Sequence, residues 1–259
     1  MSLPTWTPDA LSSEARPYAG TGWRLVEAQH IVSTLKLTDD LEEQALLEAV
    51  LEDTKPAIPA ECRHLDYLLA TPFRYGAPYP RGSRFRRAGL TEGVFYAAET
   101  ERTAVAELAF YRLLFFAESP GTPWPVNAAE FTAFSVGLAT GMSLDLTVPP
   151  LDRDARHWTD LQDYAACQAL SDAARASGIV LLRYRSVRDP DQGANLAALR
   201  CAAFAEPRPL ERRTWRIRIG PTGAQAIREF PSGRVGYALE AFLADPRLDS
   251  LREANAPRR

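Results

Sequence analysis

The chain has 259 residues, of which 46% are hydrophobic and 24% charged, and its formal net charge is −3. These values are typical of one large folded domain, or of a core with an added subdomain. No apolar run approaches the roughly 18 residues of a membrane helix, and no signal peptide is visible, so no membrane partner is expected. The negative net charge disfavours direct nucleic-acid binding, which needs an uncompensated basic surface.

The cysteine and histidine residues offer no metal-binding pattern. The three cysteines are far apart and form no Cys-x-x-Cys motif, which predicts reduced thiols and a cytoplasmic protein: Cys62, Cys167 and Cys201. The three histidines are isolated, and no Gly-rich phosphate loop is present. The sequence therefore predicts no metal site.

The first 70 residues are predicted to form a helical N-terminal section. Residues 1–20 are rich in Pro, Ser and Ala and are expected to be an extended or loosely ordered arm. The pattern of residues 23–35 predicts a helix, and a second helix is expected to begin with Thr38 or Asp39 as its N-cap. A third short helical segment follows Pro59.

Residues 71–259 are predicted to form the catalytic domain. Strands are expected over 92–98, 130–137, 142–148, 179–186, 201–205 and 213–220, and helices over 99–119 and 158–178, the latter ending at Gly178. Few connections look like regular crossovers. The fold class predicted is α+β, with a mixed, largely antiparallel sheet and flanking helices.

The basic residues are almost all arginine, since only Lys36 and Lys55 are lysine among 30 basic side chains. A GC-rich genome is the simplest explanation. Local arginine clusters can still form a phosphate pocket, because the guanidinium fork matches a diphosphate better than an ammonium does.

Glu107 is the most informative single residue. In a helix its neighbours would be Thr103, Phe110 and Leu114, so the carboxylate lies beside an apolar face. A carboxylate there costs free energy unless a charged or hydrogen-bonding group meets it. Two interpretations stay open: a buried ion pair with an arginine, or a carboxylate held in a cleft for catalysis.

Three further segments are candidates for function. They are Phe73-Arg74-Tyr75 at the start of an expected strand, the run from Gly82 to Arg87, and Tyr184-Arg185-Ser186-Val187-Arg188, to which Tyr96 at a strand end is added. Each also has a plain structural interpretation. A serine that ends a buried strand is usually a turn residue, and an arginine-rich loop is usually solvated.

Taken in order, these segments resemble the RES domain family, named for its Arg-Glu-Ser residues. The matching runs are FRYGAPYPRGSRFR, GVFYAAETERTAVAEL and GIVLLRYRSVRDPDQGANLAAL, within about residues 70–205. The resemblance implies a fold similar to ADP-ribosyltransferases and a toxin of a toxin–antitoxin pair. The helical N-terminal section is similar to the extension of longer members.

The resemblance also implies roles for particular residues. The implied catalytic residues are Glu107, Arg74 and Ser186, and the implied NAD+-binding residues are Arg74, Tyr75, Arg84, Tyr96 and Ser186. Arg86 is an alternative to Arg84. The run GSRFR departs from the Gly-Gly-Arg-Trp-like turn of many members, which leaves open whether the aromatic ring at Phe85 lines the pocket.

The implied reaction is cleavage of the nicotinamide–ribose bond of NAD+. Arginines would bind the diphosphate, tyrosine rings would stack on the cationic nicotinamide, and Glu107 would stabilise positive charge on the ribose. The acceptor of ADP-ribose could be water, phosphate or a target protein. The expected partner is a cognate antitoxin that resembles a DNA-binding regulator.

Two other classes of function compete with this prediction. A non-catalytic module could bind nucleic acid through its arginine clusters, with salt-sensitive affinity and no effect on NAD+. An inert interaction protein could have kept the fold without the chemistry.

Overall fold

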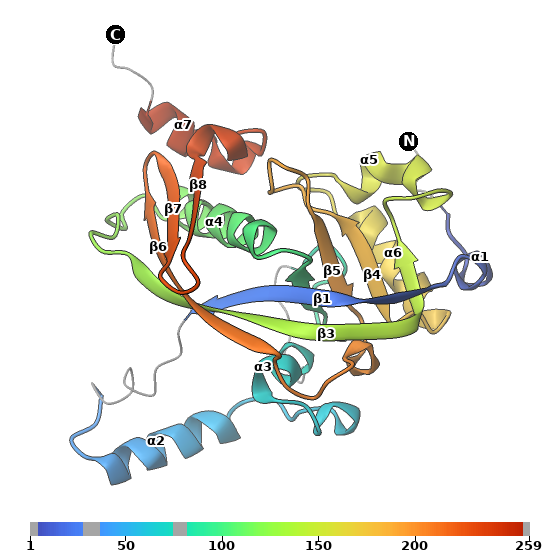
Figure 1. Ribbon diagram of the computed structural model, residues 1–259, viewed down its shortest axis with the longest axis horizontal. Coiled ribbons are helices and arrows are strands. Elements are labelled where there is room, and N and C mark those ends of the chain that lie inside the picture. Colours follow the sequence, from blue (N-terminus) through green and yellow to red (C-terminus); the bar gives the residue numbers. More distant parts are fainter. Residues whose placement is uncertain (1–4, 28–36, 75–81, 256–259) are drawn as a thin grey trace.

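The computed structural model describes residues 5–27, 37–74 and 82–255. Its centre is an eight-stranded sheet in the order β1-β2-β5-β4-β3-β6-β7-β8, in which β1 also pairs with β3. Strands β3 and β4 run parallel, and the other pairings are antiparallel. The extra pairing closes five strands into a ring, from which β6, β7 and β8 extend as a separate wing (Figure 1).

The longest strands, β1 and β3, lie side by side along the molecule (Figure 1). The strands are β1 (Arg16–Glu27), β2 (Phe95–Ala98), β3 (Ala129–Asp145), β4 (Leu181–Arg185), β5 (Ala194–Ala198), β6 (Glu211–Gly220), β7 (Gly223–Arg228) and β8 (Gly233–Ala238). Strands β4 and β5 are short and lie inside the sheet, so the segment that joins them begins and ends in well-supported backbone.

The helices other than α2 pack on both sides of this sheet. The helices are α1 (Pro8–Ser13), α2 (Leu41–Asp53), α3 (Tyr67–Ala70), α4 (Glu101–Glu118), α5 (Ala155–Trp158), α6 (Ala165–Ala176) and α7 (Asp249–Asn255), with short 3-10 turns η2 (Ala60–Cys62), η3 (Thr71–Phe73), η4 (Leu151–Asp154), η5 (Cys201–Ala203), η6 (Leu239–Phe242) and η7 (Pro246–Leu248). Within the described residues, no helix combines the length and apolar character needed to cross a bilayer.

Three clusters of buried side chains hold these layers together. Helix α4 packs against β6, β7, β8 and the C-terminal turns. Residues 62–73 pack on one face of β2, β3, β4 and β5. Helices α1, α5 and α6 cover the other face of β4 and β5. The junction of the first and third clusters, between α4 and the ends of β4 and β5, is where the candidate site lies.

The predicted fold class is confirmed: the structure is α+β with a mixed, largely antiparallel sheet and flanking helices. The predicted helix over 99–119 is α4, and the alternation in 213–220 is that of β6, with Trp215, Ile217 and Ile219 buried. Gly178 has φ +78, as its predicted position at a helix end requires.

The predictions for the first 27 residues are wrong in two places. Residues 8–13 form α1, with Thr7 as its N-cap, where a loose arm was expected. Residues 23–27 belong to β1 and not to a helix, and residues 28–35 lie outside the described part. The apolar spacing of such a short window fits either a helix or a strand. The segment forms a strand because β1 pairs with β3 over 11 residue pairs.

The second helix forms as expected, but its N-cap is Asp40, whose carboxylate accepts hydrogen bonds from the Glu42 and Glu43 amides. Its apolar stripe does not pack as a core would, since Leu41 and Leu46 are 72% and 66% exposed. The N-terminal section thus contains both helices and the strand that joins it to the sheet. The division of the chain at residue 70 stays a prediction.

Three strand predictions need correction. The two strands expected over 130–137 and 142–148 are one continuous strand, β3. Residues 201–203 form a 3-10 turn, and the strand in this region is β5, at 194–198. Arg74 follows a 3-10 turn and does not begin a strand. The predicted helix over 158–178 is shorter, with α6 beginning at Ala165.

The expectation of three reduced thiols is wrong for two of them. Cys62 and Cys201 form a disulfide, with their Cα atoms 5.6 Å apart, although 139 residues separate them in the chain. The two cysteines lie close together because residues 62–73 pack against the sheet. Their separation in the sequence could not predict this contact. Cys167 is a buried free thiol, and burial raises its pKa to about 11, so it stays protonated near neutral pH.

Candidate functional site

The Glu107 carboxylate is held on one side by two hydrogen-bond donors. Ser186 Oγ donates to Glu107 Oε1 at 2.7 Å, and Asn195 Nδ2 donates to the same oxygen at 2.6 Å. Within the described residues, the other oxygen, Oε2, accepts no hydrogen bond from a side chain. The carboxylate is therefore oriented by neutral donors and is not neutralised by a hydrogen-bonded arginine, which favours a cleft residue over a buried ion pair.

Helix α4 places Glu107 as the sequence predicts. Thr103, Phe110 and Leu114, its helical neighbours, are all buried. Thr100 caps the helix and receives a hydrogen bond from the Thr103 amide, so α4 begins at a fixed point relative to the sheet. A rigid helix of 18 residues then carries Glu107 to the end of β4.

Ser186 lies directly after β4, where the chain leaves the sheet. Its amide donates to the Gly193 carbonyl, and its Oγ accepts hydrogen bonds from the Arg188 and Asp189 amides at 3.2 and 3.0 Å. The hydroxyl thus both caps its own loop and donates to Glu107. The turn role and the functional role, which the sequence left as alternatives, are compatible in one side chain.

Asn195 is a candidate site residue that sequence reasoning missed. It is 4% exposed, lies opposite Tyr184 in the β4–β5 register, and its Oδ1 is buried without a hydrogen-bond partner in the described structure. The available signal was a single polar residue in the otherwise apolar strand ANLAA. A buried amide in such a strand requires a partner, and that partner is Glu107.

Tyr96 uses its hydroxyl to hold the turn at residues 82–87. Its Oη lies 2.8 Å from Ser83 Oγ and accepts the Phe85 amide at 3.0 Å. Gly82 has φ +67, and a side chain there would meet the Arg86 carbonyl, so the tight turn requires glycine. The Phe85 ring is buried and packs edge-to-face on Tyr184, 4.8 Å between centroids, so it belongs to the core.

Arg84 is 8% exposed and is held by backbone carbonyls. Its guanidinium donates to the Trp158 carbonyl at 2.6 Å and the Asp160 carbonyl at 2.8 Å, and it lies over the Tyr164 ring at 4.7 Å. None of these groups is a carboxylate, so its positive charge is retained beside the site. Arg86 donates to Thr91, and the choice between the two arginines stays a prediction.

A cluster of tyrosines surrounds these groups. The pKa of Tyr184 is raised well above its usual value by burial and by the nearby charges of Glu107 and Tyr96, against the effect of Arg84. The pKa of Tyr111 is also raised, by desolvation and then by Glu107. The Tyr111 side chain is nevertheless 52% exposed. Arg84, Tyr96 and Glu107 thus all lie near enough to Tyr184 to affect its pKa.

Arg74 makes different contacts. Its Nη2 lies 2.5 Å from Glu52 Oε1 of α2, its side chain is 12% exposed, and its Nε is buried without a partner in the described structure. Its described contacts do not include Tyr96, Glu107 or Ser186. Its roles in catalysis and binding stay predictions. Tyr75 lies outside the described residues.

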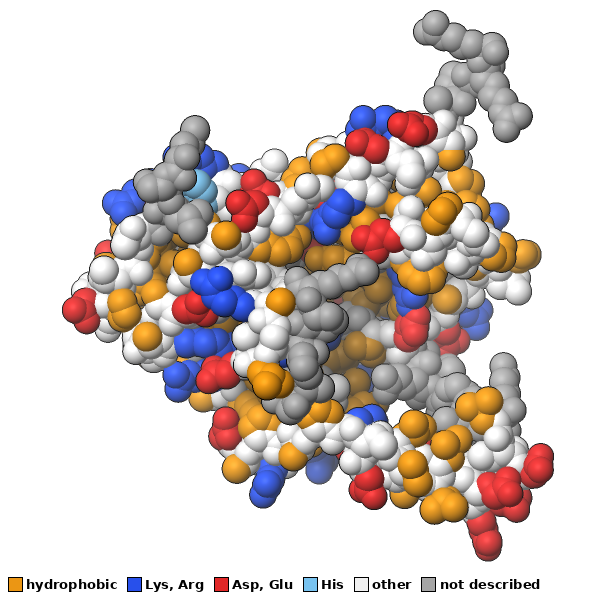
Figure 2. Space-filling model, turned by 180° about the vertical axis from the view of Figure 1, so that it is seen from behind, with side chains coloured by type: hydrophobic (Ala, Val, Ile, Leu, Met, Phe, Trp, Pro, Cys, Tyr) orange, Lys and Arg blue, Asp and Glu red, His pale blue; other side chains and the backbone are white. Residues whose placement is uncertain are grey.

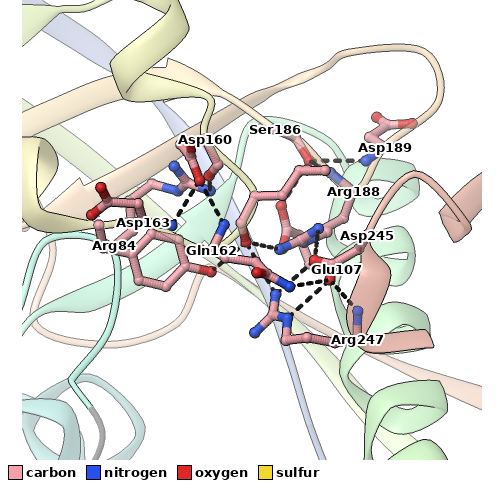
Figure 3. Close-up of polar contacts among 12 residues, drawn as sticks. Arg84, Glu107, Asp160, Gln162, Asp163, Ser186, Arg188, Asp189, Asp245 and Arg247 are labelled. Atoms are coloured by element: carbon pink, nitrogen blue, oxygen red, sulfur yellow. Dashed lines mark hydrogen bonds and ion pairs between the residues drawn. The ribbon is translucent and has the colours of Figure 1, made fainter. Parts of the chain in front are cut away.

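A cavity of about 280 Å³ opens beside Ser186. It is lined by Thr159, Arg185, Ser186, Val187, Arg188, Asp189, Pro190, Gln192 and Ala241. The Arg185 guanidinium donates to the neutral Gln192 amide oxygen at 3.3 Å, so it presents a positive charge at this wall. Figure 3 shows how Ser186, Glu107 and Arg84 lie relative to the arginine and aspartate side chains around them.

The family model described as the RES domain matches residues 58–219, more than half of the chain, and the chain therefore belongs to this family. Among solved structures, the chain is similar to one in a crystal structure of the M. tuberculosis MbcT–MbcA toxin–antitoxin complex. The identity is 13% and the TM-score 0.45, over 92% of this chain and 95% of that one. No curated protein matches the chain.

Proposed function

We propose that this protein cleaves the nicotinamide–ribose bond of NAD+ and acts as the toxin of a toxin–antitoxin pair. Membership of the RES domain family supports the proposal. The observation that carries it is the clamp on Glu107, in which Ser186 and Asn195 donate to Oε1 while no side chain of the described residues donates to Oε2. An oriented carboxylate with an open oxygen is suited to stabilise a positive charge that develops during a reaction.

The proposed chemistry is dissociation at the anomeric carbon of the nicotinamide riboside. The C1′–N bond breaks, its electron pair stays with the nicotinamide nitrogen, and nicotinamide departs neutral. The ribose gains oxocarbenium character, as in glycoside hydrolysis, and Glu107 stabilises it. A nucleophile then adds to C1′ and loses its proton. Water, phosphate or a protein side chain would each complete the reaction.

The binding roles follow from the charges around the clamp. The Arg84 guanidinium, held without a carboxylate partner, favours the diphosphate on its side of the site. The half-exposed Tyr111 ring offers a face for the cationic nicotinamide. Arg74 would join the diphosphate only if it exchanged Glu52 for the ligand.

Nicotinamide release from NAD+ tests the proposal. We expect purified protein to release nicotinamide and Glu107→Gln to lose about 100-fold in rate, since the amide removes the charge and keeps the shape. The matched control is Glu118→Gln, an exposed residue of the same helix, which should keep the parent rate. Equal rates for Glu107→Gln and the parent would contradict the assignment.

Growth and labelling experiments test the rest of the proposal. Expression of the parent gene alone should slow bacterial growth, and Glu107→Gln should not. Co-expression of a cognate antitoxin, expected to be a DNA-binding regulator, should restore growth. Labelled NAD+ in a lysate separates the acceptors, because a labelled protein indicates ADP-ribosyl transfer, whereas free ADP-ribose or its phosphate indicates NAD+ degradation.

A nucleic-acid-binding module has less support. Figure 2 shows lysine and arginine side chains of one face scattered among acidic ones, without a continuous basic stripe. Many described arginines pair with carboxylates, such as Arg87 with Asp172 and Arg216 with Glu229. Those charges are compensated and would add little to phosphate affinity.

A further inference from the structure

The residues after the family match contribute a carboxylate to the neighbourhood of the site. The RES domain match ends at residue 219, and the chain continues through β7, β8 and the turns η6 and η7. Asp245 lies between these turns and is 1% exposed. Figure 3 shows it among the side chains that surround Glu107 and Ser186.

Asp245 binds two guanidinium groups. Its Oδ2 lies 2.7 Å from Arg188 Nη1 and 2.8 Å from Arg247 Nη2, while Oδ1 accepts Arg247 Nε at 3.0 Å. Although burial alone would raise it, the pKa of Asp245 is lowered to about 2 by hydrogen bonds from Arg247 and the charge of Arg188. The carboxylate is therefore ionised under all ordinary conditions, and the trio carries one net positive charge.

Arg188 connects the Asp245 carboxylate to the loop of residues 186–189. Its side chain is 3% exposed, and its guanidinium lies over the Phe110 ring at 3.8 Å and donates to the Leu161 carbonyl at 2.9 Å. Phe110 is three residues after Glu107 on α4. The side chain of Arg188 is thus fixed between the C-terminal turns and the helix that bears Glu107.

The backbone of the same residue holds the serine of the site. The Arg188 and Asp189 amides donate to Ser186 Oγ, and that oxygen donates to Glu107 Oε1. With its lone pairs engaged by two amides, the Ser186 hydroxyl is directed at the carboxylate. A displacement of Arg188 would move the amides that fix this direction.

We propose that Asp245 is a positioning residue of this site: through Arg188 it holds the 186–189 loop so that Ser186 Oγ meets Glu107. The consequence for catalysis rests on the proposed function of Glu107. Without the carboxylate, Arg188 would be a buried cation without its counter-charge, which is costly, and the guanidinium would leave Phe110 for solvent. The loop would then lose its side-chain anchor.

The test uses Asp245→Asn in the full chain, with two readouts. For nicotinamide release from NAD+, we expect kcat to fall about tenfold or more with KM changed less than threefold, because a misplaced catalytic group lowers rate more than binding. For amide hydrogen exchange, we expect the Arg188 and Asp189 amides to exchange at least about tenfold faster, while the Ile217 and Ile219 amides of β6 keep their rates.

The controls separate positioning from general stability. Asp249→Asn changes an exposed ion pair with Arg252 in the same C-terminal segment and should leave both readouts unchanged. Asp245→Glu keeps the charge and shifts the carboxylate. If Asp245→Asn does not fold, Asp245→Glu should show the same two effects at smaller size.

The outcomes are distinguishable. Unchanged exchange at Arg188 and Asp189, or equal acceleration at Ile217 and Ile219, would overturn the positioning role. If the parent releases no nicotinamide, the proposed function fails, and the exchange readout still decides whether Asp245 holds the loop.

Discussion

Both hydrogen-bond donors of Glu107 bind the same carboxylate oxygen. One oxygen thus orients the side chain, and the other is the candidate for contact with a substrate. A carboxylate that accepts two short hydrogen bonds on Oε1 is fixed in rotation, while Oε2 accepts none from the side chains that the structure describes. Neutral donors orient the carboxylate and leave its negative charge in place, whereas an arginine partner would cancel that charge. Ser186 directly follows β4 and Asn195 lies in β5, so the orientation depends on the register of these two strands.

Ser186→Ala removes one of the two hydrogen bonds to Glu107 Oε1 and tests whether catalysis needs it. Loss of a hydrogen bond to a charged group costs about 1.5–3 kcal/mol, and about 1.4 kcal/mol is a factor of ten in rate. We therefore expect nicotinamide release to slow by about 10- to 100-fold. Ser171→Ala is the control, because Ser171 Oγ is buried without a hydrogen-bond partner in the described structure. A Ser186→Ala rate within twofold of the parent would mean that the hydroxyl serves only its loop.

The segment between β4 and β5 connects the site to α4 by a second route. Thr103 Oγ1 donates to Asp189 Oδ2 at 2.7 Å, and the Gly193 amide donates to the same oxygen at 3.3 Å. The loop is thus fixed at Ser186, at Asp189 and at its return into β5. Gly193 is required by this close approach, since a Cβ there would lie 2.2 Å from Thr103 Oγ1 and 2.8 Å from Asp189 Oδ2.

Gly193→Ala should therefore destabilise the protein. Forced separation of packed groups costs about 1–3 kcal/mol, which urea unfolding would measure as a lower transition midpoint with an unchanged slope. Gly141→Ala in β3 is the control, because a Cβ there meets nothing within 4 Å, and it should be neutral or slightly stabilising. Equal midpoints for the two variants would show that the loop has room to adjust.

The molecule as a whole places charged groups from distant parts of the chain in contact across its layers. Asp245 with Arg188 and Arg247 joins the C-terminal turns to the loop after β4, and Arg188 lies over Phe110 of α4. Glu101 with Arg213 and Arg228 joins the start of α4 to the wing strands β6 and β7. These pairs are half-buried or buried, so the loss of one partner would leave an uncompensated charge away from water.

Acid unfolding should show how much the ionised Asp245 carboxylate stabilises the folded protein. Its pKa falls from 3.8 in the unfolded chain to about 2 in the folded protein, so its stabilisation is complete above about pH 4 and is lost as pH falls toward 2. We expect the free energy of unfolding to drop more in the parent than in Asp245→Asn over this window. The extra drop should be on the order of 2 kcal/mol, since one pKa unit is about 1.4 kcal/mol. Parallel curves would contradict this.

Local pattern was sufficient for the elements with strong signals. The 3.6-residue period of α4, the alternation of β6 and the turn at Gly178 all follow from residues within a few positions of each other. The position of Glu107 beside an apolar face also follows from helical geometry. The resemblance to the family indicated Ser186, whose hydroxyl donates a hydrogen bond to Glu107 in the structure.

What the tertiary structure decided depends on contacts between distant residues. The strand β1 exists because β3 pairs with it, Cys62 meets Cys201 because residues 62–73 pack on the sheet, and Arg74 pairs with Glu52 across two elements. Asn195 meets Glu107 from strand β5, and Asp245 meets Arg188 from beyond the family match. Local propensities are weak compared with burial and pairing, so a sequence window cannot reveal contacts made across the fold.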